Sequence, residues 1–245
     1  MKLSTWLPVI FLMAIVHAQA TETVVLLHGL GRTYLSMSHL AAELERAGYH
    51  VVNLSYPSRT LPIETIASDW LPTQLRASGA APAPRVHFVT HSMGGIVLRQ
   101  WLAHAAPAER ANLGRVVMIA PPNAGSEVSE RLAGFPPFRW FTGENGRRLG
   151  TRVTDLPQAL GPWPVDAPPL GIIAGDRSLN PLFSAWLPGP DDGKVSVAST
   201  RLAGMTDAVV LHHSHTWLIW RADTVAQVLS FLRVGRFDTA ATPKK

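Results

Sequence analysis

The stretch Val89-Thr90-His91-Ser92-Met93-Gly94-Gly95 lies between an apolar run and a segment whose apolar residues have helical spacing. A buried strand, a tight turn with Ser92 at its apex and a following helix are the parts of a nucleophile elbow, which raises a serine hydroxyl above a sheet. Gly94 fits the G-x-S-x-G pattern of this turn, whereas Thr90 replaces its first glycine. The alternative is an ordinary N-cap serine. The strand–turn–helix context favours the elbow.

Short apolar, β-branched runs alternate with helical patterns along the rest of the chain. Six runs are predicted to be strands: Thr23–Leu27, Val51–Tyr56, Val86–Thr90, Arg115–Ala120, Leu170–Ala174 and Ala208–His212. Near-continuous apolar strands separated by helices indicate a parallel sheet that is covered on both faces. We therefore expect an α/β fold with a mostly parallel six-stranded sheet and helices on both faces. Pro72 is expected to break or kink the helix that begins near Ile63.

The first twenty residues have the layout of a secretory signal peptide. Lys2 supplies a positive start, Leu7–Val16 is apolar, and Ala18-Gln19-Ala20 is a small-x-small cleavage site. The apolar run is too short for a membrane-spanning helix. We predict cleavage near Ala20, export to the periplasm or the medium, one domain over 21–238 and a disordered tail over 239–245. An uncleaved anchor or an extra N-terminal helix are the alternatives.

Composition excludes several classes of protein. The 245 residues are 47% hydrophobic and 16% charged, as is typical of a globular domain. The chain has no cysteine, which excludes disulfides, thiol catalysis and cysteine-ligated metals. Its formal net charge is +5, but the arginines are scattered and no nucleic-acid-binding motif is present. We therefore expect a basic surface without a nucleic-acid partner.

A nucleophilic serine requires a general base, which in this architecture follows the last strand. Three histidines compete for that role: His212, His213 and His215. His215 is the best placed, in the loop before the final helix, whereas His212 is assigned to the strand as a core or sheet-edge residue. The three histidines also suggest a metal site, which is disfavoured because no Asp or Glu stands within the run. No metal or other cofactor is expected.

The acid that orients the histidine should lie between the fifth strand and the last one. Asp176 directly follows a strand, whereas Asp192 precedes a glycine that allows a sharp turn. Asp191, the other member of the pair Asp191-Asp192, is a further candidate. The alternative for Asp191 is a solvated turn residue, and the alternative for Asp176 is a loop residue that caps the segment after it. Spacing alone does not choose between Asp176 and Asp192.

Backbone N–H groups are expected to stabilise the oxyanion of the tetrahedral intermediate. One donor should be Met93, which follows the serine, and the other should be Leu30 in the loop after the first strand. Glycines beside Leu30 allow that loop to bend so that an N–H can point at the reacting carbonyl. His28 precedes this loop and is expected to have a structural hydrogen-bonding role.

Four motifs together resemble those of α/β-hydrolase lipases, particularly small bacterial ones. They are the His28-Gly29-Leu30-Gly31 loop, the elbow, Ala120-Pro121-Pro122-Asn123-Ala124-Gly125-Ser126, and Asp192-Gly193-Lys194-Val195. His215 occupies the family's histidine position, and the resemblance spans about residues 23–232. It implies a minimal α/β-hydrolase fold with Ser92 as nucleophile, Asp192 as acid and His215 as base. The resemblance therefore favours Asp192 over Asp176.

The expected activity is that of a serine hydrolase, a lipase or esterase that cleaves carboxylic esters through an acyl-enzyme. The long segment 127–166 is aromatic-rich and is interpreted either as a lid over an acyl pocket or as a loop packed on the body. Contact with a lipid interface, the acyl chain length and the oligomeric state stay open. An acyltransferase or lipid deacylase with the same triad is the alternative, and a non-catalytic binding protein of this fold is less favoured.

Overall fold

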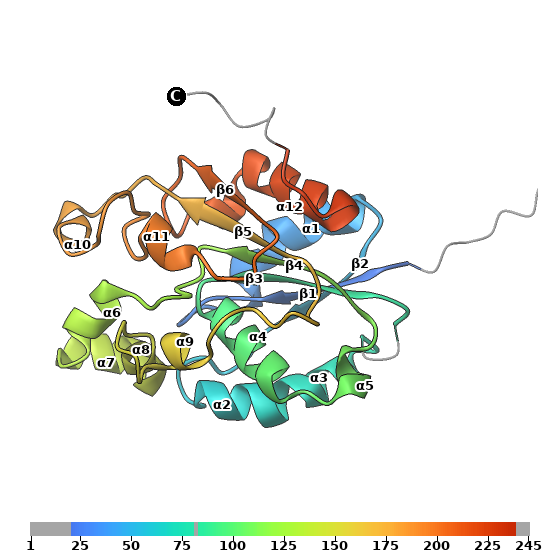
Figure 1. Ribbon diagram of the computed structural model, residues 1–245, viewed down its shortest axis with the longest axis horizontal. Helices are drawn as coiled ribbons and strands as arrows, with labels where there is room; N and C mark the ends of the chain where they lie inside the picture. The colour runs from blue at the N-terminus through green and yellow to red at the C-terminus, as the bar shows by residue number, and fades with distance from the viewer. Residues whose placement is uncertain (1–20, 81–82, 239–245) are drawn as a thin grey trace, which may run out of the picture.

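The computed structural model describes residues 21–80 and 83–238, which form one sheet with helices on both faces (Figure 1). The predicted signal peptide and the predicted C-terminal tail lie outside the described residues. The strands are β1 (Thr23–Leu27), β2 (His50–Leu54), β3 (Val86–His91), β4 (Leu113–Ile119), β5 (Leu170–Gly175) and β6 (Asp207–Leu211). Each begins and ends within two residues of its predicted bounds.

The six strands are hydrogen-bonded in the order β2-β1-β3-β4-β5-β6, and every pair is parallel. The predicted fold class is therefore confirmed, with a sheet that is parallel throughout. Because parallel strands point the same way, the loops that follow all six strands meet at one edge of the sheet, which is where α/β proteins bind ligands. We call this the carboxyl edge.

Helices cover both faces of the sheet. One face carries α1 (Ser38–Arg46) and α12 (Ala222–Val234), and the other carries α2 (Ile63–Thr65), α3 (Leu71–Ala77), α4 (Met93–His104) and α5 (Pro107–Arg110) (Figure 1). Alternate residues of each strand point to opposite faces. Val24 and Leu26 accordingly pack with α1 and α12, whereas Val25 and Leu27 pack with α4. Both apolar faces of the sheet are thus buried.

Further short helices lie near the carboxyl edge (Figure 1). They are α6 (Glu127–Leu132), α7 (Pro136–Thr142), α8 (Glu144–Arg148), α9 (Leu156–Ala159), α10 (Pro181–Ser184), α11 (Val197–Thr200) and the 3₁₀ turns η1 (Tyr34–Met37) and η3 (Leu218–Trp220). We call residues 127–166, which contain α6 to α9, the cap. Within 21–80 and 83–238, no helix has the length and apolarity needed to cross a membrane.

Pro72 does not end its helix, so the break, which is one of the two predicted outcomes, is wrong. The chain stays helical from α2 into α3 through the π-helical turn η2 (Ile66–Trp70), in which the Leu71 N–H bonds to the Ile66 carbonyl five residues back. Pro72 then follows as the second residue of α3, directly after the π-helical turn. The wider turn is how the helix accommodates the proline.

Candidate active site

Ser92 stands between the end of β3 and the first residue of α4. Its φ of 53° is in a region that non-glycine residues rarely adopt, so the turn is strained at the serine. Its N–H bonds to the Ile119 carbonyl over 2.9 Å, which ties the turn to β4. A Cβ on Gly94 would lie 2.5 Å from the Leu27 carbonyl oxygen. Glycine at that position therefore lets α4 pack closely against the end of β1.

A chain of hydrogen bonds runs from Ser92 into the protein. Ser92 Oγ lies 3.0 Å from Nε2 of His215, and Nδ1 of His215 lies 2.7 Å from Oδ2 of Asp192. With Asp192 ionised, Nδ1 donates to the carboxylate, which leaves Nε2 as an acceptor for the serine hydroxyl. The three residues come from the loops after β3, β5 and β6. The structure therefore brings together the three residues that the sequence analysis named as nucleophile, base and acid.

Asp192 is buried and held by the backbone. Its Oδ1 accepts the N–H groups of Lys194 (3.0 Å) and Val195 (2.9 Å), and the Asp192 carbonyl accepts the His215 N–H (3.0 Å). Ser126 donates to the Lys194 carbonyl over 2.7 Å, so the turn that carries the acid is fixed to the loop after β4. These bonds fix the carboxylate before any substrate binds.

The competing acids and histidines form other pairs. His212 pairs with Asp176 (2.8 Å) and His213 with Asp223 (2.7 Å), and neither histidine bonds to the serine. The expectation that His212 is a core or sheet-edge residue is wrong, because β6 ends at Leu211 and the His212 side chain is 67% exposed.

Asp191 is buried, so the alternative of a solvated turn residue is wrong. Its Oδ1 accepts the Ser184 hydroxyl (2.9 Å) and the Gly193 N–H (2.7 Å), so its role is to hold the turn. In the part of the chain that the structure describes, no three His, Asp or Glu side chains are grouped as metal ligands.

The two N–H groups expected to bind an oxyanion, those of Leu30 and Met93, donate to no group within the described residues. Leu30 lines the cavity that contains Ser92, and Met93 is the first residue of α4, where helical N–H groups have no partner within the helix. Nδ1 of His28 donates to the Gly29 carbonyl over 2.8 Å, and Tyr56 donates to the His28 carbonyl. Burial lowers the pKa of His28, so the ring stays neutral.

His91, which precedes the nucleophile, is a second buried histidine. Its Nε2 donates to the His215 carbonyl over 3.1 Å, while Nδ1 has no hydrogen-bond partner. Burial and then the charge of the neighbouring His215 hold the pKa of His91 well below 6.5. His91 therefore supports the backbone of His215 as a neutral ring.

Ser92 and His215 open into a mainly apolar cavity of about 240 Å³. Cap residues supply much of its apolar lining: Val128, Leu132, Phe138, Phe141 and Leu149. Of the other aromatic residues in the cap, Trp163 is buried in the core, whereas Phe135 and Trp140 are exposed to solvent. The cap thus both packs on the body and lines the cavity beside the serine.

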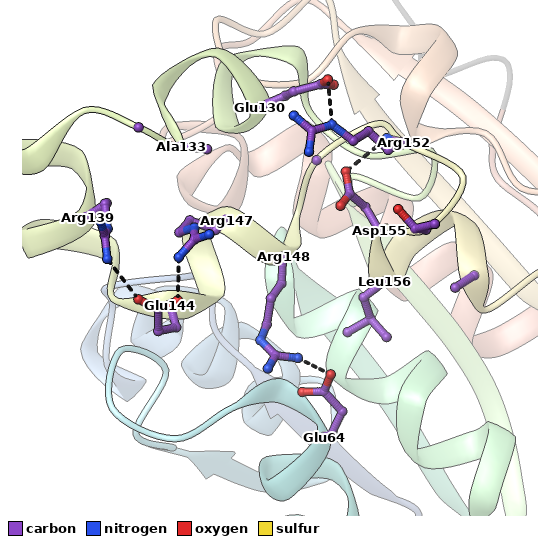
Figure 2. A pocket seen from close by; sticks show the side chains of 14 residues that line it. Glu64, Glu130, Ala133, Arg139, Glu144, Arg147, Arg148, Arg152, Asp155 and Leu156 are labelled. Atoms are coloured by element: carbon purple, nitrogen blue, oxygen red, sulfur yellow. Dashed lines mark hydrogen bonds and ion pairs between the residues drawn. The ribbon is translucent and has the colours of Figure 1, made fainter.

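A larger cavity of about 580 Å³ lies between the cap and α2 and does not include Ser92. Figure 2 shows that its arginines point at acidic side chains: Arg139 and Arg147 at Glu144, Arg152 at Glu130, and Arg148 at Glu64. The charges are therefore compensated within the protein. The Arg148–Glu64 pair joins the cap to α2, so this cavity is part of the junction between cap and body.

Two buried polar residues fasten the cap, and neither was predicted from the sequence. Asn145 accepts the Ile63 N–H (3.1 Å) and donates to the carbonyls of Ser58 (2.8 Å) and Leu61 (2.7 Å). Arg99 on α4 donates to four acceptors: two on Asn123 in the loop after β4, the Pro157 carbonyl in α9 and the Gly161 carbonyl just after α9. Burial lowers the pKa of Arg99 to about 10. The sequence offers a signal for Arg99 alone, which is a charged residue inside a mostly apolar helical segment.

Comparisons with known proteins agree with this architecture. The model of the Alpha/beta hydrolase family matches residues 24–240. A search of curated protein sequences found no match. The solved structure of mature lipase BlEst2 from Bacillus licheniformis superposes with a TM-score of 0.67 at 16% identity, covering 88% of this chain and 92% of that one.

Two other solved structures are similar in fold. For phospholipase PlaB from Legionella pneumophila the TM-score is 0.68 at 18% identity, over 90% of this chain and 61% of that one. For the metagenomic carboxyl esterase MGS0156 the TM-score is 0.63 at 21% identity, over 82% of this chain and 66% of that one. The parallel sheet, the strained serine turn after β3 and the family match over most of the sequence lead to one conclusion. This chain belongs to the alpha/beta hydrolase family.

Proposed function

We propose that this protein is a serine hydrolase that cleaves carboxylic esters through an acyl-enzyme on Ser92. The observation that carries the proposal is the hydrogen-bond chain from Asp192 through His215 to the hydroxyl of Ser92, with distances of 2.7 and 3.0 Å. A base within hydrogen-bond reach of a serine, itself oriented by a buried carboxylate, is the arrangement that activates a hydroxyl as a nucleophile.

In the first half of the reaction, Ser92 Oγ attacks the ester carbonyl carbon and passes its proton to Nε2 of His215. The carbonyl oxygen becomes an oxyanion, which the N–H groups of Leu30 and Met93 stabilise. The intermediate then collapses, the carbon–oxygen bond to the alcohol breaks, and His215 gives its proton to the departing oxygen. Asp192 stays ionised throughout and stabilises the imidazolium.

In the second half, water replaces the alcohol. His215 takes a proton from the water as it attacks the acyl-enzyme, and returns that proton to Ser92 Oγ when the carboxylic acid leaves. No step needs a group beyond the side chains and N–H groups already named.

The substrate's acyl group is proposed to occupy the cavity beside Ser92. Phe138, Phe141 and Leu149 give that cavity an apolar wall, as an acyl chain requires. The similar structures named as a lipase, a phospholipase and a carboxyl esterase all carry ester-cleaving names, which supports an ester as the substrate. The cap is proposed to act as a lid, and residues 1–20 to direct export before cleavage near Ala20.

An organophosphonate with a fluoride leaving group tests the proposal, because it reacts much faster with an activated serine than with an ordinary hydroxyl group. The expected result is one adduct, mapped by peptide mass spectrometry to Ser92, that is absent in Ser92→Ala and strongly reduced in His215→Ala. A folded wild-type protein without an adduct would contradict the proposal and favour a binding protein. Product analysis in water–alcohol mixtures then separates hydrolysis from acyl transfer.

A further inference from the structure

Two basic side chains line the mouth of the cavity that contains Ser92. Arg32 comes from the loop after β1, and Lys194 comes from the turn that carries Asp192. Both side chains are exposed. Two segments that are distant in the sequence thus each place one positively charged side chain at the entrance to the same site.

In the described part of the chain the two cations form no ion pair. Burial and then Arg32 lower the pKa of Lys194, and the opposite charge of Asp192 raises it to a smaller extent. No Asp or Glu lines the cavity. Neither side chain forms an ion pair or hydrogen bond within residues 21–80 and 83–238, in contrast to the arginines of the cavity between cap and α2. Both charges also act on His91, which lines the same cavity. Burial and then His215 lower the pKa of His91 most, and Lys194 and Arg32 each lower it further. An anion that enters the cavity meets the positive potential of both side chains, and Asp192 offsets part of the contribution of Lys194.

The two cations lie on the histidine side of the site. Each lines a second cavity that includes Thr216, which follows His215, and that includes no residue of the cap. The apolar wall formed by Phe138, Phe141 and Leu149 belongs to the cap. The site therefore has an apolar half supplied by the cap and a cationic half beside His215.

That division matches the two halves of an ester. The departing alcohol takes its proton from His215, so it leaves on the histidine side, and the acyl chain is left for the apolar half. We propose that Arg32 and Lys194 form an anion subsite, and that the preferred substrates are acyl esters whose alcohol carries a phosphate or carboxylate. This inference rests on the proposed ester hydrolysis and narrows its substrate class.

The test is a set of hexanoyl esters that share the acyl chain and differ in the alcohol. Glycerol, glycerol 3-phosphate, 4-hydroxybutyrate and choline supply neutral, dianionic, monoanionic and cationic alcohols. All are used as dissolved monomers, so that binding to a lipid surface does not contribute. The wild-type kcat/KM for each anionic ester is expected to exceed that for the neutral ester roughly tenfold. The choline ester is expected to fall below the neutral one.

Variants assign the preference to the two residues. Arg32→Gln and Lys194→Gln should each reduce the anionic-to-neutral ratio of kcat/KM several-fold, and the double variant should bring it close to one. Arg236→Gln removes one positive charge at the opposite edge of the sheet and should leave the ratio at its wild-type value. Arg32→Glu should raise the cationic-to-neutral ratio. Added salt should lower the wild-type ratio, because these charges are exposed.

The outcomes separate this inference from the proposed function. If no ester is cleaved, the proposed hydrolase activity fails and the subsite fails with it. If esters are cleaved with an anionic-to-neutral ratio near one, or with a ratio that both variants leave unchanged, the subsite alone is overturned. A phosphate preference without a carboxylate preference identifies a phosphate ester as the ligand. Inhibition of neutral-ester cleavage by inorganic phosphate, lost in the double variant, would show that free phosphate occupies the same subsite.

Discussion

The Nδ1–H of His28 donates to the carbonyl oxygen of Gly29 over 2.8 Å, and the Arg32 N–H donates to the same oxygen over 3.2 Å. The Gly29 carbonyl and the Leu30 N–H belong to one planar peptide, in which the C=O and N–H bonds point in opposite directions. Fixing the carbonyl therefore fixes the direction of the Leu30 N–H. His28 acts as a positioning residue for the proposed oxyanion site without touching the substrate.

Replacing His28 by alanine should lower kcat by about 10²-fold with little change in KM, because an oxyanion donor is used mainly in the transition state. Steady-state kinetics on a soluble ester measures both constants. His104→Ala, an exposed histidine on α4, is the matched control. A rise in KM with unchanged kcat, or a loss of activity explained by unfolding in circular dichroism, would contradict this role.

The two candidate acids are distinguished by one pair of variants. Asp192→Asn should lower kcat by about 10⁴-fold, because the amide no longer selects the histidine tautomer in which Nε2 accepts the serine proton. Asp176→Asn is the control, since Asp176 pairs with the exposed His212 and should change kcat only a few-fold. If the larger loss fell on Asp176, the assignment of Asp192 as the acid would be wrong.

Sequence patterns predicted the strands well because a parallel sheet buries its central strands on both faces. Thr23–Leu27 and Leu170–Gly175 are consequently continuous apolar runs with clear ends. The serine turn could be predicted equally well, since it depends on a local strand–turn–helix pattern. The choice between Asp176 and Asp192 was different. It depends on which loop reaches His215 across the carboxyl edge, and spacing along the chain does not contain that information.

The histidines His28, His87 and His91 should make the protein less stable as pH falls. All three are buried, and burial lowers the pKa of each below 6.5. The unfolded chain then binds more protons than the native one just below pH 6.5. The stability that these groups contribute is therefore complete above pH 6.5 and is lost as pH falls through their native pKa values. Each contributes a slope of up to about 1.4 kcal/mol per pH unit.

Urea unfolding between pH 7.5 and 5.5 measures this slope. His87→Gln should flatten the slope, because the ring accepts the Arg115 N–H at Nδ1 (2.8 Å) and protonation of that atom abolishes the bond. His104→Gln changes an exposed histidine and should keep the wild-type slope. A free energy of unfolding that is constant or rises toward pH 5.5 would refute the account of these buried rings.

Asn145→Ala should destabilise the protein by about 2–4 kcal/mol. The substitution leaves the Ile63 N–H and the carbonyls of Ser58 and Leu61 without their partner in a buried site. Gln158→Ala removes a single exposed bond to the Ala124 carbonyl and should cost less than about 0.5 kcal/mol. Equal urea midpoints for the two variants would show that Asn145 does not fasten the cap.

Polar attachments such as Asn145 and Arg99 could not be predicted, because their partners lie far away in the chain. Asn145 bonds to residues more than eighty positions earlier in the chain. Arg99 bonds to Asn123, which precedes the cap, and to Gly161, which lies near the end of the cap. The helix through Pro72 could not be predicted for a related reason. Local propensity favours a break at proline, and the π-helical turn before it changes the outcome.

The most direct test of the central claim is the hydrolysis of a soluble p-nitrophenyl ester by wild-type protein and by Ser92→Ala, purified side by side and matched in circular dichroism. The wild type is expected to turn the ester over, with an initial burst of nitrophenol when deacylation is the slow step. In Ser92→Ala, kcat should fall about 10⁴- to 10⁶-fold. A folded Ser92→Ala variant that hydrolyses the ester at the wild-type rate would contradict the central claim.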